Sequence, residues 1–267
     1  MGKLDGKVAI VTGGGRGMGR AIAEGYVREG CRVVVIAARE RKEIDSFVSL
    51  SRKDKALALL ADVTDYLACE GVIRETISCF GRIDVLVNNA GRGMKYVSPT
   101  FMTEPARFWE TDPETWKMVI DTNVNGPFFM ARAAMPHMLR QGSGCIINLT
   151  MNHETMKRKG FSPYGPSKAA LEAETIIWAK DLEGTGITVN EILPGGATAT
   201  GMIPDDLPEA LRSKLLKPEI IVPPAIFLAS EEGRRLTGRR LLATEWSHQH
   251  PDGVPAALTI GGYDNPK

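Results

Sequence analysis

Short, almost uninterrupted apolar runs alternate with helical patterns along most of the chain. The runs are rich in β-branched residues, as expected for strands that are buried on both faces of a parallel sheet. They lie at 8–11, 33–36, 56–61, 85–88, 145–149 and 188–193. Between them, segments such as 20–30 and 169–184 have apolar residues at helical spacing and end in glycine. This alternation predicts an α/β fold with a doubly wound parallel sheet and helices on both faces.

Composition excludes several classes of protein. Of the 267 residues, 43% are hydrophobic and 24% are charged, and the formal net charge is +1. These values give no reason to expect a nucleic-acid or membrane partner. The amino-terminal segment has no long apolar run, so we expect no signal peptide and a cytoplasmic protein. The four cysteines lack CxxC spacing, which makes a zinc site improbable, and we predict no metal.

Two segments depart from the alternating pattern. Residues 92–116 and 196–218 are rich in Pro, Thr and Met, and each follows a predicted strand. Ligands of doubly wound sheets bind beyond the carboxyl ends of the strands, so both segments are predicted substrate loops. The first should contain an inserted element, followed by a helix that starts at Asp112-Pro113. We expect residues 1–246 to form a single domain and 247–267 an irregular tail.

The segment "VAIVTGGGRGMGRAIAE" joins a predicted strand to a predicted helix through a glycine-rich turn. Gly13, Gly17 and Gly19 can adopt positive φ and let the backbone approach a pyrophosphate at the helix N-terminus. Their spacing is G-x3-G-x-G, which differs from the usual G-x-G-x-x-G of dinucleotide-binding proteins. A tight turn without a ligand is the alternative. The position after the first strand favours cofactor binding.

Five motifs in order now suggest a family. They are TGxxxGxG at 12–19, NNAG at 88–91, NVNG at 123–126, YxxxK at 164–168 and PGG at 194–196. Together they resemble the short-chain dehydrogenase/reductase family from about Lys7 to Leu242. The resemblance implies a Rossmann-type sheet and hydride transfer between a nicotinamide cofactor and an alcohol or a ketone or aldehyde. It also implies a homotetramer or homodimer that packs through the helix carrying the Tyr–Lys pair, with a small-molecule substrate.

The resemblance also implies a set of cofactor contacts. They are Gly13, Gly15, Arg16, Gly17, Met18, Gly19, Arg39, Asp62, Val63, Asn89, Ala90, Gly91, Tyr164, Lys168, Pro194, Gly195, Ala197, Thr198 and Thr200. The position near Ala37, where NAD enzymes usually carry a carboxylate, is apolar. Arg16 and Arg39 suit a 2′-phosphate, so NADP is favoured over NAD. Two alternatives stay open: both arginines could be solvated, or Glu40 could bind a ribose.

The proton-transfer group is expected at Tyr164. Free tyrosine has a pKa near 10, and a nearby ammonium with a cationic nicotinamide would lower that pKa. Lys168 follows one helical turn later, on the same face. The resemblance assigns Tyr164 as acid/base, Lys168 as the group that lowers its pKa and contacts the ribose, and Asn123 as the residue that kinks a helix and holds a relaying water. A buried amide satisfied by protein groups is the alternative for Asn123.

The chain departs from the family's pattern at Met151. The family has a serine thirteen residues before the tyrosine, and methionine has no proton to donate to an oxyanion. We predict Asn152 as the substitute donor, with Thr150 second because it should point to the opposite face; His153 and Ser162 are further candidates. An alternative function follows from this swap: a protein that binds the cofactor but has impaired or lost catalysis, and acts as a sensor or scaffold.

Several large apolar residues are candidate neighbours of the site. If Met94, Phe101, Met102, Phe161 and Met202 surround it, the substrate is bulky and apolar or aromatic, although the same residues could be core. The basic run from Arg234 to Arg240 is expected to be a solvated face or an oligomer contact.

Overall fold

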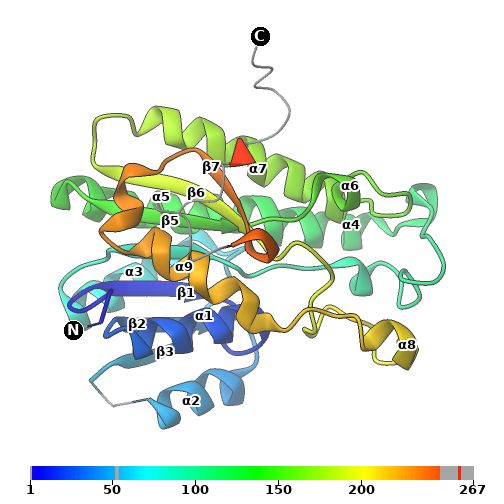
Figure 1. Ribbon diagram of the computed structural model, residues 1–267, viewed down its shortest axis with the longest axis horizontal. Coiled ribbons are helices and arrows are strands. Elements are labelled where there is room, and N and C mark those ends of the chain that lie inside the picture. The colour runs from blue at the N-terminus through cyan, green and yellow to red at the C-terminus, as the bar shows by residue number, and fades with distance from the viewer. Residues whose placement is uncertain (1, 52–53, 247–257, 260–267) are drawn as a thin grey trace.

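The strands form a single sheet in the computed structural model, which describes residues 2–51, 54–246 and 258–259 (Figure 1). The strand order is β3-β2-β1-β4-β5-β6-β7-β8. The first seven strands pair in parallel, and β8 runs antiparallel to β7. Their bounds are β1 Val8–Thr12, β2 Arg32–Ala37, β3 Ala56–Leu60, β4 Val85–Asn88, β5 Gly144–Leu149, β6 Ile187–Leu193, β7 Arg239–Leu242 and β8 Leu258–Thr259. The doubly wound prediction is confirmed, and the order reverses between β1 and β4.

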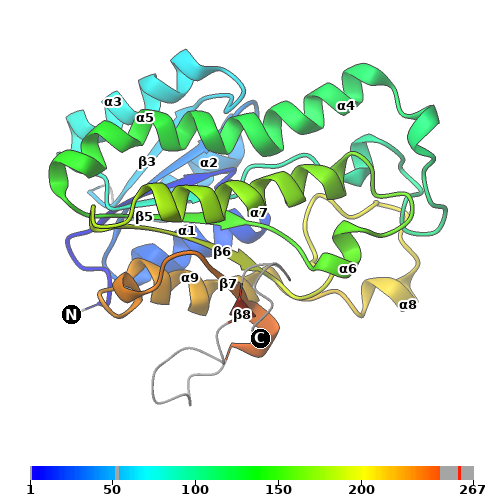
Figure 2. The ribbon, with the colours of Figure 1, turned by 90° about the horizontal axis from the view of Figure 1, so that it is seen from above.

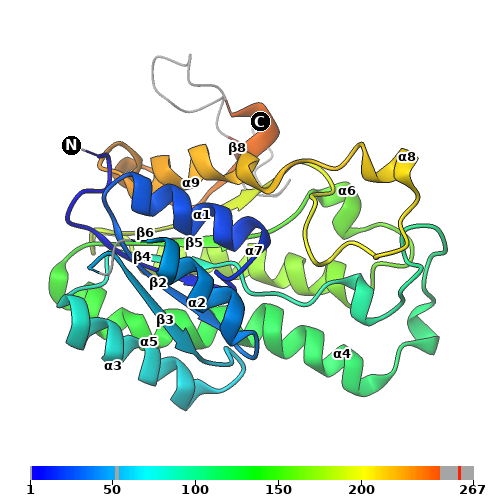
Figure 3. The ribbon, with the colours of Figure 1, turned by 90° about the horizontal axis from the view of Figure 1, so that it is seen from below.

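Helices cover both faces of the sheet. Figures 2 and 3 show α3, α5 and α7 on one face and α1, α2 and α9 on the other. In the same views α4, α6 and α8 gather at one end of the molecule. The bounds are α1 Gly17–Arg28, α2 Arg41–Leu50, α3 Tyr66–Phe80, α4 Pro113–Ile120, α5 Gly126–Gln141, α6 His153–Met156, α7 Tyr164–Asp181, α8 Glu209–Arg212 and α9 Val222–Ala229.

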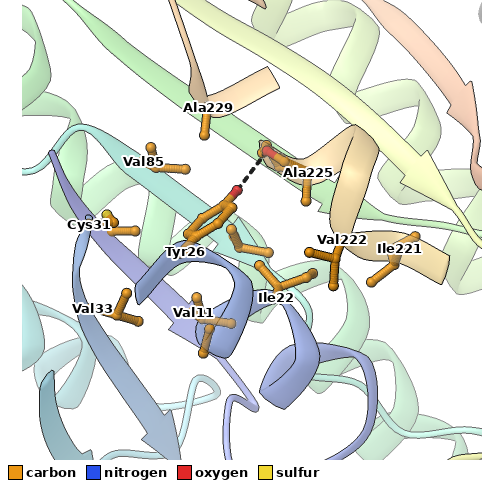
Figure 4. Packing of buried hydrophobic residues seen from close by; sticks show 14 of the residues in the cluster. Val11, Ile22, Tyr26, Cys31, Val33, Val85, Ile221, Val222, Ala225 and Ala229 are labelled. Carbon is orange, nitrogen blue, oxygen red and sulfur yellow. Dashed lines mark hydrogen bonds between the residues drawn. The ribbon is translucent and has the colours of Figure 1, made fainter. Parts of the chain in front are cut away.

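Alternate residues of each central strand enter two separate apolar layers. In β1, Val11 belongs to the layer that packs against α1 and α9, whereas Ile10 belongs to the layer against α3 and α5. Tyr26 of α1 is fully buried in the first layer, where its hydroxyl donates to the carbonyl of Ala225 at 3.0 Å (Figure 4). Burial on both faces explains why the strands read as continuous apolar runs.

The chain after β4 takes a long excursion before the next helices. It contains only short 3-10 turns until Asp112, whose side chain accepts from the Thr115 backbone N–H and caps α4, with Pro113 in the first turn. The predicted helix start is therefore confirmed. Between α4 and α5 the helix widens into a π-turn over Asp121–Asn125. Such single π-turns commonly mark functional positions.

Most of the predicted irregular tail, 247–257 and 260–267, lies outside the described residues. Within it, Leu258–Thr259 pairs with Arg239–Arg240 of β7 as strand β8, and the irregular tail stays a prediction. No helix within the described ranges is long and apolar enough to cross a membrane. Within the same ranges, no group of three or more His, Cys, Asp or Glu is placed to hold a metal ion.

Candidate active site

A groove opens where the strand order reverses, at the carboxyl ends of β1, β2, β3 and β4. Its volume is about 380 Å³. Twelve of the predicted cofactor residues line it: Gly13, Gly15, Arg16, Gly17, Met18, Arg39, Asp62, Val63, Asn89, Ala90, Gly91 and Thr200. Sequence reasoning did not select Arg92, Tyr96 and Thr122, which also line it. The only sequence feature that could have indicated these three residues was their position, after the NNAG motif or beside Asn123.

The glycine loop has the shape that a bound pyrophosphate needs. Gly13 and Gly17 have φ values of 63° and 54°, which side chains rarely tolerate. A Cβ on Gly19 would collide with the carbonyl of Gly13 and with the Asn89 amide. That amide donates to the carbonyls of Thr12 and Gly13 at 2.8 and 3.1 Å, which fixes the turn. The loop therefore brings bare backbone to the N-terminus of α1, and these residues fit a dinucleotide.

The far end of the groove holds the groups that would select the cofactor. Ala37 ends β2, so no carboxylate stands at the strand terminus. Arg39 is exposed in the groove and has no ion-pair partner among the described residues. Arg16 lies 3.5 Å from Glu43, an acid that sequence reasoning did not consider. Glu40 lines the groove too. Both cations are thus available for a phosphate, with one of them shared with Glu43.

The remaining predicted cofactor residues lie elsewhere. Gly19 packs beneath the loop, and the PGG segment after β6 does not line the groove; Pro194, Gly195, Ala197 and Thr198 thus stay predictions as cofactor contacts. Thr198 bridges to Leu216 across the second substrate loop. Tyr164 and Lys168 stand beside the groove rather than in its wall.

Helix α7 begins at Tyr164, so Lys168 follows one turn later on the same face, as predicted. The Lys168 ammonium lies 5.9 Å from the centre of the tyrosine ring and donates to the Leu149 carbonyl at 2.7 Å. Burial lowers the pKa of Lys168 to about 8, and the charge of Glu191 opposes that fall. Burial raises the pKa of Tyr164 to about 12, and the lowering expected with a cationic nicotinamide beside it stays a prediction. The ammonium alone does not outweigh desolvation of the phenolate.

Asn123 is fully buried inside the π-turn, so the predicted helix distortion is present. Its amide donates to the Arg92 carbonyl and to the Ser167 hydroxyl, both at 2.9 Å, and its oxygen accepts from the Arg92 backbone N–H. Ser167 donates in turn to the Tyr164 carbonyl. Both amide N–H groups are used by protein atoms, which matches the alternative weighed from sequence. The water-holding role stays a prediction.

Met151 lies two residues after the end of β5 and is almost fully buried. Asn152, the predicted oxyanion donor, uses its amide to donate to the Gly195 carbonyl at 3.0 Å. One amide N–H remains for another partner, so its role stays a prediction. Thr150 is buried beside Glu191, and its lower rank as a donor stays a prediction. His153 contacts Glu172 through Nε2 at 2.7 Å, which ties the segment to α7.

A compact apolar cluster surrounds the phenol. Its buried members are Met94, Phe101, Met151, Met156 and Phe161, and Met102 and Tyr164 pack against it. Met156 was missed from the sequence. Met202, from the second substrate loop, brings its sulfur 3.9 Å from the Tyr164 hydroxyl and lies over Gly91 and Gly93. The predicted apolar neighbours thus gather at Tyr164, and Met202 closes the space between it and the groove.

The basic run contradicts one expectation. Arg240 is neither solvated nor exposed: it is buried, and its Nε lies 3.0 Å from Glu191, which is fully buried on β6. Sequence reasoning missed both residues as part of the site. The only signal was a carboxylate inside the apolar run "TVNEIL". Arg240 faces inward because it alternates with Leu241, which packs in the opposite layer.

Comparisons with known proteins agree with this architecture. The sequence model described as "short chain dehydrogenase" matches residues 7–209. A 3-oxoacyl-[acyl-carrier-protein] reductase FabG of Thermotoga maritima is 31% identical over 246 residues, covering 89% of this chain and 96% of that protein. Glucose 1-dehydrogenase 2 of Bacillus subtilis is 33% identical over 250 residues, covering 89% and 93%.

A solved structure has the same fold. The 3-ketoacyl-(acyl-carrier-protein) reductase of Brucella melitensis, complexed with NADH, superposes with a TM-score of 0.79 at 27% identity, covering 90% of this chain and 96% of that one. The matched family model spans most of the chain. The chain therefore belongs to the short-chain dehydrogenase/reductase family, and it is an NAD(P)-dependent oxidoreductase.

Proposed function

We propose that the protein reduces ketones or aldehydes, or oxidises the corresponding alcohols, with NADP as the preferred cofactor. The observation that carries the cofactor preference is the end of the groove, where Arg39 is exposed and Ala37 replaces a carboxylate. Two guanidiniums can hold a 2′-phosphate by charge-assisted hydrogen bonds. Glu40 and Glu43 lie nearby and favour the ribose of NAD, so the preference rests on Arg16 and Arg39 outweighing them.

Tyr164 is proposed as the group that gives a proton to, or takes it from, the substrate oxygen. The bound nicotinamide supplies or accepts the hydride. The phenol stands at the edge of an apolar cluster, and burial raises its pKa to about 12, which favours the protonated form needed for reduction. Lys168 places its ammonium 5.9 Å from the tyrosine ring and stabilises the phenolate left by proton transfer.

The substrate is proposed to be a bulky apolar ketone. Phe101, Met151 and Phe161 make the surroundings of Tyr164 apolar, and Met202 adds a flexible thioether. The name of the Thermotoga maritima relative gives a 3-oxoacyl substrate, and the name of the Bacillus subtilis relative gives glucose. An apolar site would bind an acyl chain or an aromatic ring better than a sugar, because unpaired sugar hydroxyls are costly to bury.

The test is a substrate panel with both cofactors, read by the absorbance of reduced nicotinamide. It contains aromatic ketones, a 3-oxoacyl thioester of a small thiol, small polar ketones and glucose. We expect the highest kcat/KM for an aromatic ketone or the 3-oxoacyl thioester with NADPH. Preferential oxidation of glucose would overturn the substrate proposal, and a higher kcat/KM with NADH would overturn the cofactor proposal.

One observation favours a second function. Met151 stands where a hydroxyl is expected, and the amide of Asn152 already binds a backbone carbonyl. A cofactor-binding protein with impaired catalysis would have such a site. Tight NADPH binding by fluorescence, with no oxidation of it across the whole panel, would favour that function over the enzyme.

A homo-oligomer is also proposed, through α5 and α7. A surface groove of about 420 Å³ lies between these helices and is lined mainly by apolar residues, including Phe128, Leu139 and Trp178. Phe128 and Leu139 are 42% and 48% exposed, which is high for such large apolar side chains. Light scattering should give the mass of a dimer or tetramer, and Leu139→Glu should reduce it to that of a smaller species.

A further inference from the structure

A row of buried polar side chains crosses the sheet beneath α7. The row follows one register, because Asn88 pairs with Asn148, Asn148 with Glu191, and Glu191 with Arg240. Paired residues of neighbouring strands point to the same face. Asn148 identifies that face, since its amide donates to Thr175 of α7 at 2.8 Å. A carboxylate and a guanidinium therefore lie under the helix that carries the Tyr–Lys pair.

Glu191 is in an unusual setting for a carboxylate. It is 0% exposed, and within the described residues its neighbours are the Arg240 guanidinium and the Thr150 hydroxyl. Its partner at ion-pair distance is Arg240, whose Nε lies 3.0 Å from Oε1. That guanidinium is shared, because its Nη2 donates to the Met151 carbonyl at 2.9 Å. A carboxylate at such depth is costly to ionise unless cations lie close to it.

Charged groups face Glu191 from each side. Helix α7 contributes Lys168 and, one turn later, Glu172; strand β7 contributes Arg240. His153 of α6 reaches the set through Glu172, at 2.7 Å, and the Thr150 hydroxyl lies beside Glu191. When both carboxyl groups are ionised, the two cations balance them. We name Lys168, Glu172, Glu191 and Arg240 the buried quartet.

We propose that Glu191 is a positioning residue for the reaction: it is the buried counter-ion that keeps Lys168 an ammonium, while Arg240 holds Glu191 in place and fixes the Met151 carbonyl. The inference rests on the proposed roles of Tyr164 and Lys168. Lys168 is 4% exposed, and its only direct hydrogen-bond partner among the described residues is the Leu149 carbonyl. A neutral acceptor offers less to a buried cation than a negative charge does.

Glu191 and Lys168 titrate in the same pH range, so the charge of Glu191 acts on Lys168 at the upper pH limit of activity. Burial lowers the pKa of Lys168 to about 8, and the negative charge of Glu191 acts against that fall. Burial raises the pKa of Glu191 to about 8, Glu172 raises it further, and Arg240 opposes both. Removing the carboxylate should lower the pKa of Lys168 further, so that the ammonium is lost at a lower pH. Turnover that needs the ammonium should then stop at a lower pH as well.

The test is the pH profile of kcat for Glu191→Gln. Activity should fall with rising pH at least about one pH unit earlier than in the unmodified enzyme, which at pH 8 is about a tenfold loss relative to pH 6. Glu174→Gln is the matched control, since Glu174 is a half-buried carboxylate of α7, the helix that carries Lys168, and lies outside the buried quartet. Its profile should match that of the unmodified enzyme. An unchanged upper pH limit in a folded Glu191→Gln variant would overturn the proposal.

Two further experiments test the counter-ion role independently of turnover and of the folding of one variant. In a Tyr164→Phe background, NADPH affinity is measured by fluorescence at pH 6 and pH 8; adding Glu191→Gln should weaken binding at pH 8 but not at pH 6. Equal affinities at both pH values count against the counter-ion role. This arm needs no turnover, so it separates failure of this inference from failure of the proposed Tyr164 chemistry. If the Glu191→Gln variant does not fold, Glu191→Asp is used instead, because it moves the carboxylate away from Lys168. The upper pH limit of kcat should then fall by less than in Glu191→Gln. An unchanged upper pH limit in Glu191→Asp would overturn the proposal.

Discussion

The two sides of the active site differ in what forms them: one side is shaped mainly by backbone and the other mainly by side chains. On the side of β1 to β4, the groove is shaped by backbone: Gly13 and Gly17 adopt positive φ, and the Asn89 amide closes the loop onto main-chain carbonyls. On the side of β5 to β7, chemistry depends on side chains that come from distant segments, such as Lys168 and Glu191. A backbone-built site requires particular residues at a few positions. A side-chain-built site can exchange one donor or charge for another.

The largest expected effect is at the side-chain-built centre. Tyr164→Phe removes the proposed proton donor and should lower kcat by at least about 10²–10⁴-fold, while NADPH affinity changes little. The measurement is steady-state kinetics together with fluorescence titration of the cofactor. Substantial turnover in this variant would mean that another residue moves the proton.

Lys168→Met is the companion variant, and it should impair both turnover and cofactor binding. Its ammonium stands beside the phenol and, by the proposal, contacts the ribose. If only stability changed, with kcat and cofactor affinity intact in the folded fraction, the role assigned to Lys168 would be wrong.

Met151 and Asn152 probe how far a side-chain-built site can be rearranged. Loss of a genuine oxyanion donor costs about 10²–10³-fold in kcat, so Asn152→Ala should show a loss of that size. Met151→Ala should mainly alter KM, because it removes apolar contact in the cluster around Tyr164. If Asn152→Ala lowers Tm but leaves kcat unchanged, Asn152 is not an oxyanion donor. Its role would then be to hold the Gly195 carbonyl.

Met151→Ser restores the hydroxyl that the family carries. If a substitute donor already exists, kcat should change by less than about tenfold. A gain of a hundredfold or more would indicate an impaired site, and the cofactor-binding function would then be preferred to the enzyme.

The difference between the two sides also explains what could be predicted from sequence. The glycine loop and the Tyr164–Lys168 pair are local, because helix geometry and φ requirements act over a few neighbouring residues. The quartet was not predictable, since Glu191 and Arg240 meet only through strand pairing across 49 positions of sequence. Because Arg240 belongs to a basic run, the sequence indicated a solvated face or an oligomer contact for it, and not a buried ion pair. The burial that raises the pKa of Tyr164 depends on the whole cluster, including Met156, and was not predictable from local sequence.

A smaller effect is expected on the backbone-built side. Arg39→Ala should weaken NADPH binding about ten- to a hundredfold, the loss of roughly 1.5–3 kcal/mol from one charge-assisted contact, and leave NADH binding nearly unchanged. Fluorescence titration with both cofactors measures this. Arg41→Ala is the control, because Arg41 is a neighbouring exposed arginine that pairs with Asp45. Tighter binding of NADH than NADPH by the unmodified protein would point to Glu40 instead.

The smallest expected effect is on thermal stability. It concerns Glu174, a residue of α7 that has no proposed part in the chemistry. Burial raises the pKa of Glu174 to about 7, and its Oε2 has no hydrogen-bond partner among the described residues. Its contribution to stability is therefore complete below the ordinary carboxylate pKa and is lost as pH rises through about 7. Glu174→Gln cannot ionise, so its Tm relative to the unmodified protein should increase from pH 5 to pH 8. We expect an increase of the order of 2 °C, because partial exposure screens the charge. Glu183→Gln, an exposed carboxylate just after the helix, should give the same Tm difference at both pH values. If the Glu174→Gln difference is equally flat by differential scanning calorimetry, Glu174 has a charge partner, and an oligomer contact through α7 is the first place to look for it.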